Sequence, residues 1–328
     1  MRAAVVNAQH SFDIVEVPDP SPGPGELVLR VHACGICGSD LKAVDNMPVG
    51  LVMGHEFCGE VVAVGADIDN WRAGARVSAL PLIGCGVCAA CITGDVAHCQ
   101  RVDMVGVGGS SGAYAEFVRV AARETFVLPE PITFDAGALV EPLAVGLHAV
   151  ARAAIEPGDD VLIVGGGPVG LAVALWARHH GAREVVVSDP VAHRRATALL
   201  VGATAVIDPS TTTFDRAYPV VFECVGTPGM IALCVNATSV HGKVIVVGVC
   251  TKPDTFVPVL ALIKELTMLF VVYYRRQDFA ITIDLLAQGR LPIDAFITGT
   301  VGLDGFAAAF AELKQPTKQC KILVKPAT

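Results

Sequence analysis

The sequence predicts an α/β protein of two domains, one rich in β-strands and the other built on a doubly wound parallel sheet. Three observations support this class. A chain of 328 residues is too long for one ordinary hydrophobic core. The first third contains short β-branched runs bounded by glycine or proline, which are typical of strands. From about residue 141, apolar strands alternate with helical segments, which indicates a parallel sheet covered by helices on both faces.

The β-rich part begins with a loop at residues 18–25, which holds four prolines and two glycines. Strands are predicted after it at residues 27–32, 59–65, 113–120 and 124–128. Near the C-terminus we expect helices at residues 279–288 and 306–314 and a final strand at 321–325. Because that strand resembles the early region, it is expected to return to the first domain. The predicted domains are therefore 1–142 with 276–328, and 143–275 between them.

In the middle domain, the predicted strands alternate with helical segments. The strands are expected at residues 160–165, 184–188, 205–207, 220–224 and 243–248, and the helices at 167–181, 192–201 and 230–239.

Composition excludes several classes of function. The hydrophobic fraction of 53% and charged fraction of 17% argue against disorder, and a net charge of −8 argues against a nucleic-acid partner. The longest apolar region, residues 256–274, is interrupted by Pro258, Lys264 and Glu265, so no membrane span is predicted. The first twelve residues lack a signal-peptide pattern, and a cytoplasmic location is expected.

Four of the eleven cysteines lie within fifteen positions, as C-x2-C-x2-C-x7-C. In a chain of this length such clustering favours a metal over a disulfide framework. Four thiolates this close together can surround one tetrahedral Zn²⁺. We therefore predict a structural zinc lobe at residues 84–100, with Cys85, Cys88, Cys91 and Cys99 as ligands.

A glycine fingerprint, G-x-G-x-x-G, follows the predicted strand at 160–165 and opens the next helix. Gly165 permits a tight turn, Gly167 lets the backbone approach a pyrophosphate, and Gly170 lets helix and strand pack closely. With Pro168 and Val169 between them, these residues would bind a dinucleotide at a helix N-terminus in a Rossmann domain. The simpler alternative is a turn that binds no nucleotide.

Cofactor choice is predicted from Asp189, nineteen residues beyond Gly170 at the end of the second strand. A carboxylate there accepts hydrogen bonds from ribose hydroxyls and repels a 2′-phosphate, which favours NAD over NADP. Arg194 could lie along the adenine or weaken that repulsion. A helix-capping role for Asp189 is the alternative.

A second group of residues occurs in C-G-I-C-G-S-D at 34–40 and G-H-E at 54–56. Together with the cysteine lobe, E-P-L-A-V-G-L-H-A at 141–149 and the glycine fingerprint, these motifs resemble the zinc-containing medium-chain alcohol dehydrogenase family. The similarity is greatest to its polyol, butanediol and threonine dehydrogenase branch, and it covers nearly the whole chain. It implies a GroES-like catalytic domain beside the Rossmann domain.

The resemblance also implies roles for individual residues. Cys37 and His55 would bind a catalytic zinc, with an acid as third ligand. Glu141 stands where that branch has its acid, and Glu56 can also reach the metal, so the choice between them stays open. Ser39 would relay the alcohol proton, and Asp40 would orient His55. Where many relatives have a relay histidine, this chain has Lys42, to which no role is assigned.

The predicted function is a zinc-dependent dehydrogenase that transfers hydride between a secondary alcohol or diol and NAD, giving the ketone. Two zinc ions per chain are expected, with a small alcohol or ketone as the partner molecule. A homodimer or homotetramer is expected to form through an apolar edge strand at residues 266–274. The alternatives are a zinc-free quinone or enoyl reductase on the same fold, or a non-enzymatic NAD(P)-binding redox sensor. The zinc-ligand set argues against both.

Overall fold

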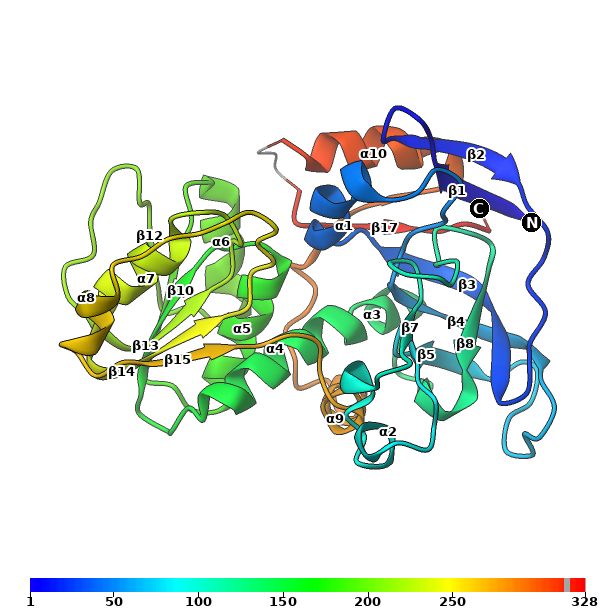
Figure 1. The fold of residues 1–328 in the computed structure, drawn as a ribbon, viewed down its shortest axis with the longest axis horizontal. Coiled ribbons are helices and arrows are strands. Elements are labelled where there is room, and N and C mark those ends of the chain that lie inside the picture. Colours follow the sequence, from blue (N-terminus) through cyan, green and yellow to red (C-terminus); the bar gives the residue numbers. More distant parts are fainter. Residues whose placement is uncertain (316–318, 328) are drawn as a thin grey trace. The chain divides into compact units, whose positions relative to one another are not determined.

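The computed structural model describes residues 1–315 and 319–327. The chain forms two compact units, each with its own sheet (Figure 1). The first unit contains Met1–Glu141, Tyr274–Arg290 and Ile297–Thr328, and the second contains Pro142–Tyr273 and Leu291–Phe296.

The first unit is built on a seven-stranded sheet in which the last strand of the chain pairs antiparallel with an early one. Its main path runs in the order β16 (Ile297–Val301), β17 (Lys321–Val324), β3 (Glu26–Gly35), β4 (Glu56–Val64), β5 (Arg76–Ala79) and β9 (Thr125–Val127), and β8 (Phe117–Ala121) also pairs with β3. Two small sheets pair β1 (Arg2–Val6) with β2 (Phe12–Glu16) and β6 (Leu82–Ile83) with β7 (Asp103–Met104). Strand β16 was not predicted, because its glycine and two threonines lack an apolar alternation.

The first unit also contains short helices, although its first third was expected to be nearly all strand. They are α1 (Gly38–Ala43), α2 (Ala89–Ile92) and α3 (Phe134–Ala138), joined later in the chain by α9 (Arg276–Ala287) and α10 (Phe306–Leu313). Single turns of 3₁₀ helix lie at Val44–Asn46, Val96–His98, Ala122–Glu124 and Leu303–Gly305. The early helices have four to six residues, too few to show a 3.6-residue apolar period.

The second unit is a six-stranded, fully parallel sheet with helices between its strands. The strand order is β12 (Ala205–Ile207), β11 (Glu184–Ser188), β10 (Asp160–Val164), β13 (Tyr218–Glu223), β14 (Thr238–Val246) and β15 (Thr267–Phe270). The helices are α4 (Val140–Ala153), which begins in the first unit, α5 (Pro168–His179), α6 (Ala192–Val201), α7 (Met230–Ala237) and α8 (Pro258–Leu262). This is the doubly wound arrangement that the sequence predicted, with the fingerprint between the central strand β10 and α5.

The largest boundary differences from the prediction in the second unit are at the start of β14 and the end of β15, and helices α4 and α8 were not predicted. Helix α7 ends at Ala237, because the β-branched Thr238 already belongs to β14. The edge strand β15 covers only Thr267–Phe270 of the predicted 266–274. Tyr273, three residues beyond the end of the strand, has a positive φ of 58°, which is incompatible with a continuing strand. Among the described residues, none of the helices is long and apolar enough to span a membrane.

Candidate functional site

The first part of the site forms where β3 ends and α1 begins. Cys37 is the N-cap residue of α1, and its Sγ accepts hydrogen bonds from the Ser39 backbone N–H at 3.4 Å and from the Ser39 hydroxyl at 3.1 Å. Lys42 lies in the last turn of the same short helix. The cysteine sulfur and the serine hydroxyl are therefore held in contact by one turn of helix.

His55 is brought to Cys37 by the segment that enters β4. Cys37, His55 and Glu56 each place a potential ligand atom within 4.8 Å of the others. The Nδ1 atom of His55 lies 3.3 Å from Oδ1 of Asp40, a residue of α1 with no exposed surface. Asp40 thus faces one ring nitrogen of His55 and leaves Nε2 for a ligand.

Glu56 is paired with Lys321, the first residue of the returning strand β17. Lys321 Nζ donates to both carboxylate oxygens of Glu56, at 2.7 and 2.5 Å, and to the carbonyl of Ile36 at 3.0 Å. Both side chains are 1% exposed. Burial disfavours the lysine charge, but the Glu56 carboxylate outweighs it and raises the pKa of Lys321. The pair could not be inferred from the sequence, because 265 residues separate its members.

Tyr114 is a second residue that the sequence analysis missed. Its hydroxyl donates to Oδ2 of Asp40 at 2.6 Å, and the side chain is completely buried. The only sequence signal was a tyrosine in the predicted strand 113–120, a position that equally fits an apolar core residue.

Glu141 lies near these residues but outside the group of three. It is 6% exposed and belongs to the first turn of α4. Burial raises the pKa of Glu141 to about 7, and the negative charge of Glu56 acts in the same direction, while His55 and a hydrogen bond with Tyr274 oppose it. The two glutamates left open by the sequence thus differ in position: Glu56 joins Cys37 and His55, and Glu141 stands beside them.

The arrangement suits a divalent cation. A tetrahedral zinc ion with ligands at about 2.0–2.3 Å would separate its ligand atoms by roughly 3.3–3.8 Å, within the 4.8 Å limit that the group meets. The acidic side chains of the site are those of Cys37, Asp40, Glu56 and Glu141, and Lys321 is a buried cation paired with Glu56. Although burial disfavours a charged imidazole, Asp40 and Cys37 together raise the pKa of His55 well above its usual range. A bound Zn²⁺ would balance this excess negative charge.

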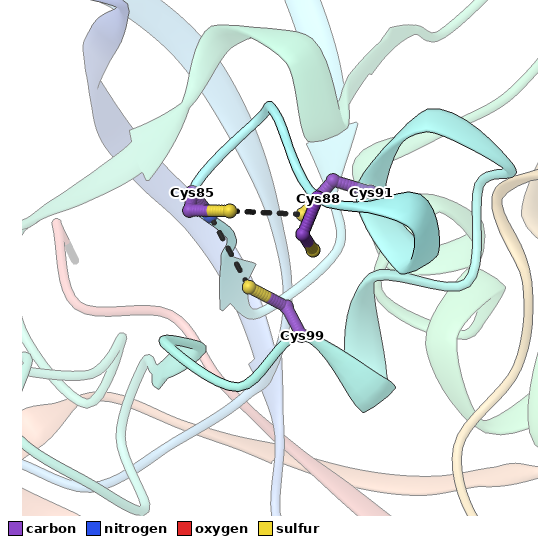
Figure 2. Close-up of side chains that lie close together, drawn as sticks. All are labelled: Cys85, Cys88, Cys91 and Cys99. Carbon is purple, nitrogen blue, oxygen red and sulfur yellow. Dashed lines mark hydrogen bonds between the residues drawn. The ribbon is translucent and has the colours of Figure 1, made fainter.

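The four-cysteine cluster is formed within a single lobe of the first unit. Figure 2 shows the side chains of Cys85, Cys88, Cys91 and Cys99 converging, and their sulfurs all lie within 4.8 Å of one another. The Sγ of Cys99 accepts from the backbone N–H groups of Cys85 and Arg101, each at 3.4 Å. Hydrogen bonds from the backbone of Val87 and then Cys88 lower the pKa of Cys85 to about 5, which favours the thiolate that metals bind. The cluster therefore fits a tetrahedral zinc ion.

The glycine fingerprint lies at the carboxyl edge of the parallel sheet. Gly165 follows β10 with a φ of +103°, and Pro168 occupies the first turn of α5. A Cβ atom at Gly170 would lie 1.9 Å from the carbonyl oxygen of Gly165, so only glycine fits there. Gly167 has open space around its Cα, as a backbone approached by a ligand requires. Val169, in the same first turn of α5, completes the predicted set.

Asp189 follows β11 and is 3% exposed. Its Oδ2 accepts from the backbone N–H of Gly166 at 2.8 Å, and its Oδ1 from that of Val191 at 2.8 Å. Arg194, from α6, lies 3.7 Å from the same carboxylate. The structure thus joins Asp189 and Arg194 to the glycine loop, which the Asp189 carboxylate supports through its hydrogen bond with Gly166.

Comparison with known proteins supports the division into a β-rich part and a parallel-sheet part. Residues 23–130 match the alcohol dehydrogenase GroES-like domain, and residues 168–288 match the zinc-binding dehydrogenase domain. The chain is 29% identical to sorbitol dehydrogenase of Bacillus subtilis, over 99% of this chain and 97% of the relative. It is 30% identical to (R,R)-butanediol dehydrogenase of the same organism, over 99% and 100% of the two chains.

Among solved structures, that butanediol dehydrogenase superimposes with a TM-score of 0.88, covering 99% of each chain. A zinc-binding dehydrogenase from Sinorhizobium meliloti, bound to NADP, superimposes with a TM-score of 0.90 at 31% identity, again over 99% of each chain.

Proposed function

Because the chain belongs to the zinc-containing medium-chain alcohol dehydrogenase family, we propose that it is an NAD-dependent dehydrogenase of secondary alcohols or diols that produces the ketone. The observation that carries the proposal is the grouping of Cys37, His55 and Glu56 in the β-rich unit. A zinc-free reductase or a sensor without catalytic activity would have no use for this donor set.

The catalytic zinc would be held by Cys37, His55 and Glu56, with Glu141 as the neighbouring acid. Bound there, zinc supplies Lewis acidity that lowers the pKa of an alcohol ligand. Glu56 can ligate because it keeps lone pairs beyond those that Lys321 uses, and Lys321 compensates its charge. A second zinc held by Cys85, Cys88, Cys91 and Cys99 would be structural, because four thiolates fill its coordination sphere.

Ser39 would accept the proton that the alcohol releases. Its hydroxyl contacts Cys37 Sγ at 3.1 Å, so it lies beside the metal-binding sulfur. Asp40 would fix the tautomer and orientation of His55 through its contact with Nδ1. A bound nicotinamide would supply the acceptor for the hydride that the carbinol carbon gives up, and Ser39 would carry the alcohol proton away from the oxygen.

The parallel-sheet unit would bind the dinucleotide at Gly165, Gly167, Pro168, Val169 and Gly170, with Asp189 and Arg194 at the adenosine end. A buried carboxylate at Asp189 supports NAD, because a 2′-phosphate would meet its negative charge. We expect Asp189→Gly to raise the NADP-to-NAD ratio of kcat/KM by about tenfold or more, roughly the 1.4 kcal/mol scale of one charge contact. An unchanged ratio would contradict this role.

The substrate is a small alcohol or ketone, and relatives with sorbitol and butanediol dehydrogenase activity favour a polyol or vicinal diol. Two copies of the chain would pair along β15, an edge strand with Phe270 68% exposed, into a homodimer or homotetramer. All eleven cysteines are free thiols, which suits a reducing compartment such as the cytoplasm.

The test combines metal analysis with an alcohol panel. The purified enzyme should contain two zinc ions per chain and reduce NAD with vicinal diols or polyols. Cys37→Ser should lose one zinc and all turnover while still binding NAD. The matched control is Cys34→Ser, three residues away in β3 and outside the donor group, which should keep both ions. Retained turnover in Cys37→Ser, or a single zinc in the unmodified enzyme, would refute the proposal.

A further inference from the structure

The Tyr114 hydroxyl is a buried polar group to which the proposed reaction gives no task. Tyr114 has no exposed surface, and its phenol oxygen lies 2.6 Å from Oδ2 of Asp40 and 3.4 Å from the carbonyl oxygen of Gly35. A phenylalanine would fill the same space in an apolar core, so the hydroxyl group itself needs an explanation.

The Tyr114 ring is held rigidly. It packs against Phe306 with the ring centroids 4.5 Å apart and against Phe12 at 6.3 Å. Its backbone N–H donates to the carbonyl of Met53 at 2.9 Å. A Cβ atom at Gly54, where φ is +102°, would lie 2.7 Å from the ring, so glycine is required for the ring to pack there. Tyr114 is therefore packed against, and hydrogen-bonded to, the segment that leads directly into His55.

Asp40 makes its two contacts through different carboxylate oxygens. Oδ2 accepts from the Tyr114 hydroxyl, and Oδ1 lies 3.3 Å from Nδ1 of His55. The terminal torsion of an aspartate is intrinsically broad, so a carboxylate with one partner could rotate. The hydroxyl fixes that rotation, because it occupies one oxygen and leaves the other facing the imidazole.

We propose that Tyr114 is a positioning residue of the catalytic zinc site, whose hydroxyl fixes the Asp40 carboxylate so that it orients His55 toward the metal. The inference rests on the proposed function, since it requires a zinc ion on His55. It places Tyr114 second beyond the metal ligand His55, after Asp40. Because the three residues come from β4's entrance, α1 and the segment before β8, the link joins three separate parts of the fold.

The experiment is a chelator titration of the zinc-loaded enzyme carrying Tyr114→Phe, which removes only the hydroxyl. Loss of a direct partner of a metal ligand typically weakens metal binding by about 10–100-fold, and because Tyr114 acts one step further out, through Asp40, we expect zinc affinity at the Cys37 site to fall by about tenfold, the lower end of that range. The four-cysteine site should keep its affinity and serves as an internal reference. The matched control is Tyr218→Phe, another buried tyrosine, at the start of β13 in the other unit, which should leave both zinc affinities unchanged.

A second comparison separates positioning from general loosening of the core. In an Asp40→Ala background the hydroxyl has lost its link to His55 and keeps only the Gly35 carbonyl as an acceptor, so adding Tyr114→Phe should weaken zinc binding by less than about twofold more. An equal loss in both backgrounds would overturn the inference, as would an unchanged affinity in Tyr114→Phe alone. If the unmodified enzyme binds zinc only at the cysteine cluster, it is the proposed function that fails, and the inference fails with it.

Discussion

Replacing Lys321 by methionine is the sharpest perturbation of the site. Methionine keeps much of the length and apolar surface of lysine, but it removes the cation and its three hydrogen bonds to Glu56 and Ile36. The Glu56 carboxylate, 1% exposed, would then lie buried without its partner. Breaking such a pair from one side typically costs about 3–5 kcal/mol. For a unit of this size that corresponds to a fall in Tm of roughly 6–20 °C.

The assay is denaturant unfolding of the enzyme after zinc has been removed from the Cys37 site, so that the metal does not replace Lys321 as the partner of Glu56, with two further variants to assign the cause. Lys321→Met with Glu56→Gln leaves no lone charge, so most of the lost stability should return. Lys325→Met is the matched control, because Lys325 pairs with Asp135 at a half-exposed position, where an ion pair contributes less than about 1 kcal/mol. The reasoning is refuted if Lys321→Met costs no more than Lys325→Met, or if the second substitution restores nothing.

Two further predictions concern the parallel-sheet unit. Gly170→Ala would place a Cβ atom 1.9 Å from the Gly165 carbonyl oxygen, so α5 would have to shift. We expect NAD affinity to fall by about tenfold or more, measured by titration with the cofactor. An unchanged affinity would contradict the close packing of α5 on the glycine loop. Asp160→Asn should cost about 1–2 kcal/mol of unfolding free energy at neutral pH, because hydrogen bonds from Arg183 and then Arg216 lower the pKa of Asp160. The stabilisation by the ionised Asp160 is complete above the pKa of an unfolded aspartate and is lost as pH falls through its lower pKa in the folded protein. The unfolding free energies of the unmodified protein and of Asp160→Asn should therefore converge in acid. A difference that persisted in acid would argue against this role of the ion pairs.

The features that could be predicted from the sequence are those determined by residues close together in the chain. The cysteine spacing, the glycine fingerprint after an apolar strand and the alternation of strands with helices each lie within a short stretch of chain, and local geometry then leaves few alternatives. Short helices such as α3 and the strand β16 escaped prediction, because four to six residues carry too little periodicity to separate helix from turn.

The partners of the site residues could not be predicted, for a different reason. Lys321 reaches Glu56 only because β17 pairs with β3, and Tyr114 reaches Asp40 only because its segment crosses the start of β4. Neither position carries a motif, and a lysine beginning an apolar strand ordinarily suggests a solvent-exposed end. Contacts across 265 and 74 residues depend on the sheet order, which the linear pattern does not specify.

The two proposed zinc sites differ in the same way, because one is built from local residues and the other from distant ones. The four cysteines come from one lobe whose own backbone N–H groups stabilise a thiolate, so the lobe can prepare its ligands with little help from distant chain. The Cys37 site instead gathers several buried acidic groups from β3's end, β4 and α4, and that much negative charge is costly to bury without cations. Lys321, on the last strand of the chain, supplies one positive charge, and the metal would supply the remaining positive charge. Assembly of the catalytic donors therefore depends on the completed sheet of the first unit, whereas the four-cysteine site depends mainly on its own loop. Truncation before β17 should remove zinc from the Cys37 site and leave the four-cysteine site loaded.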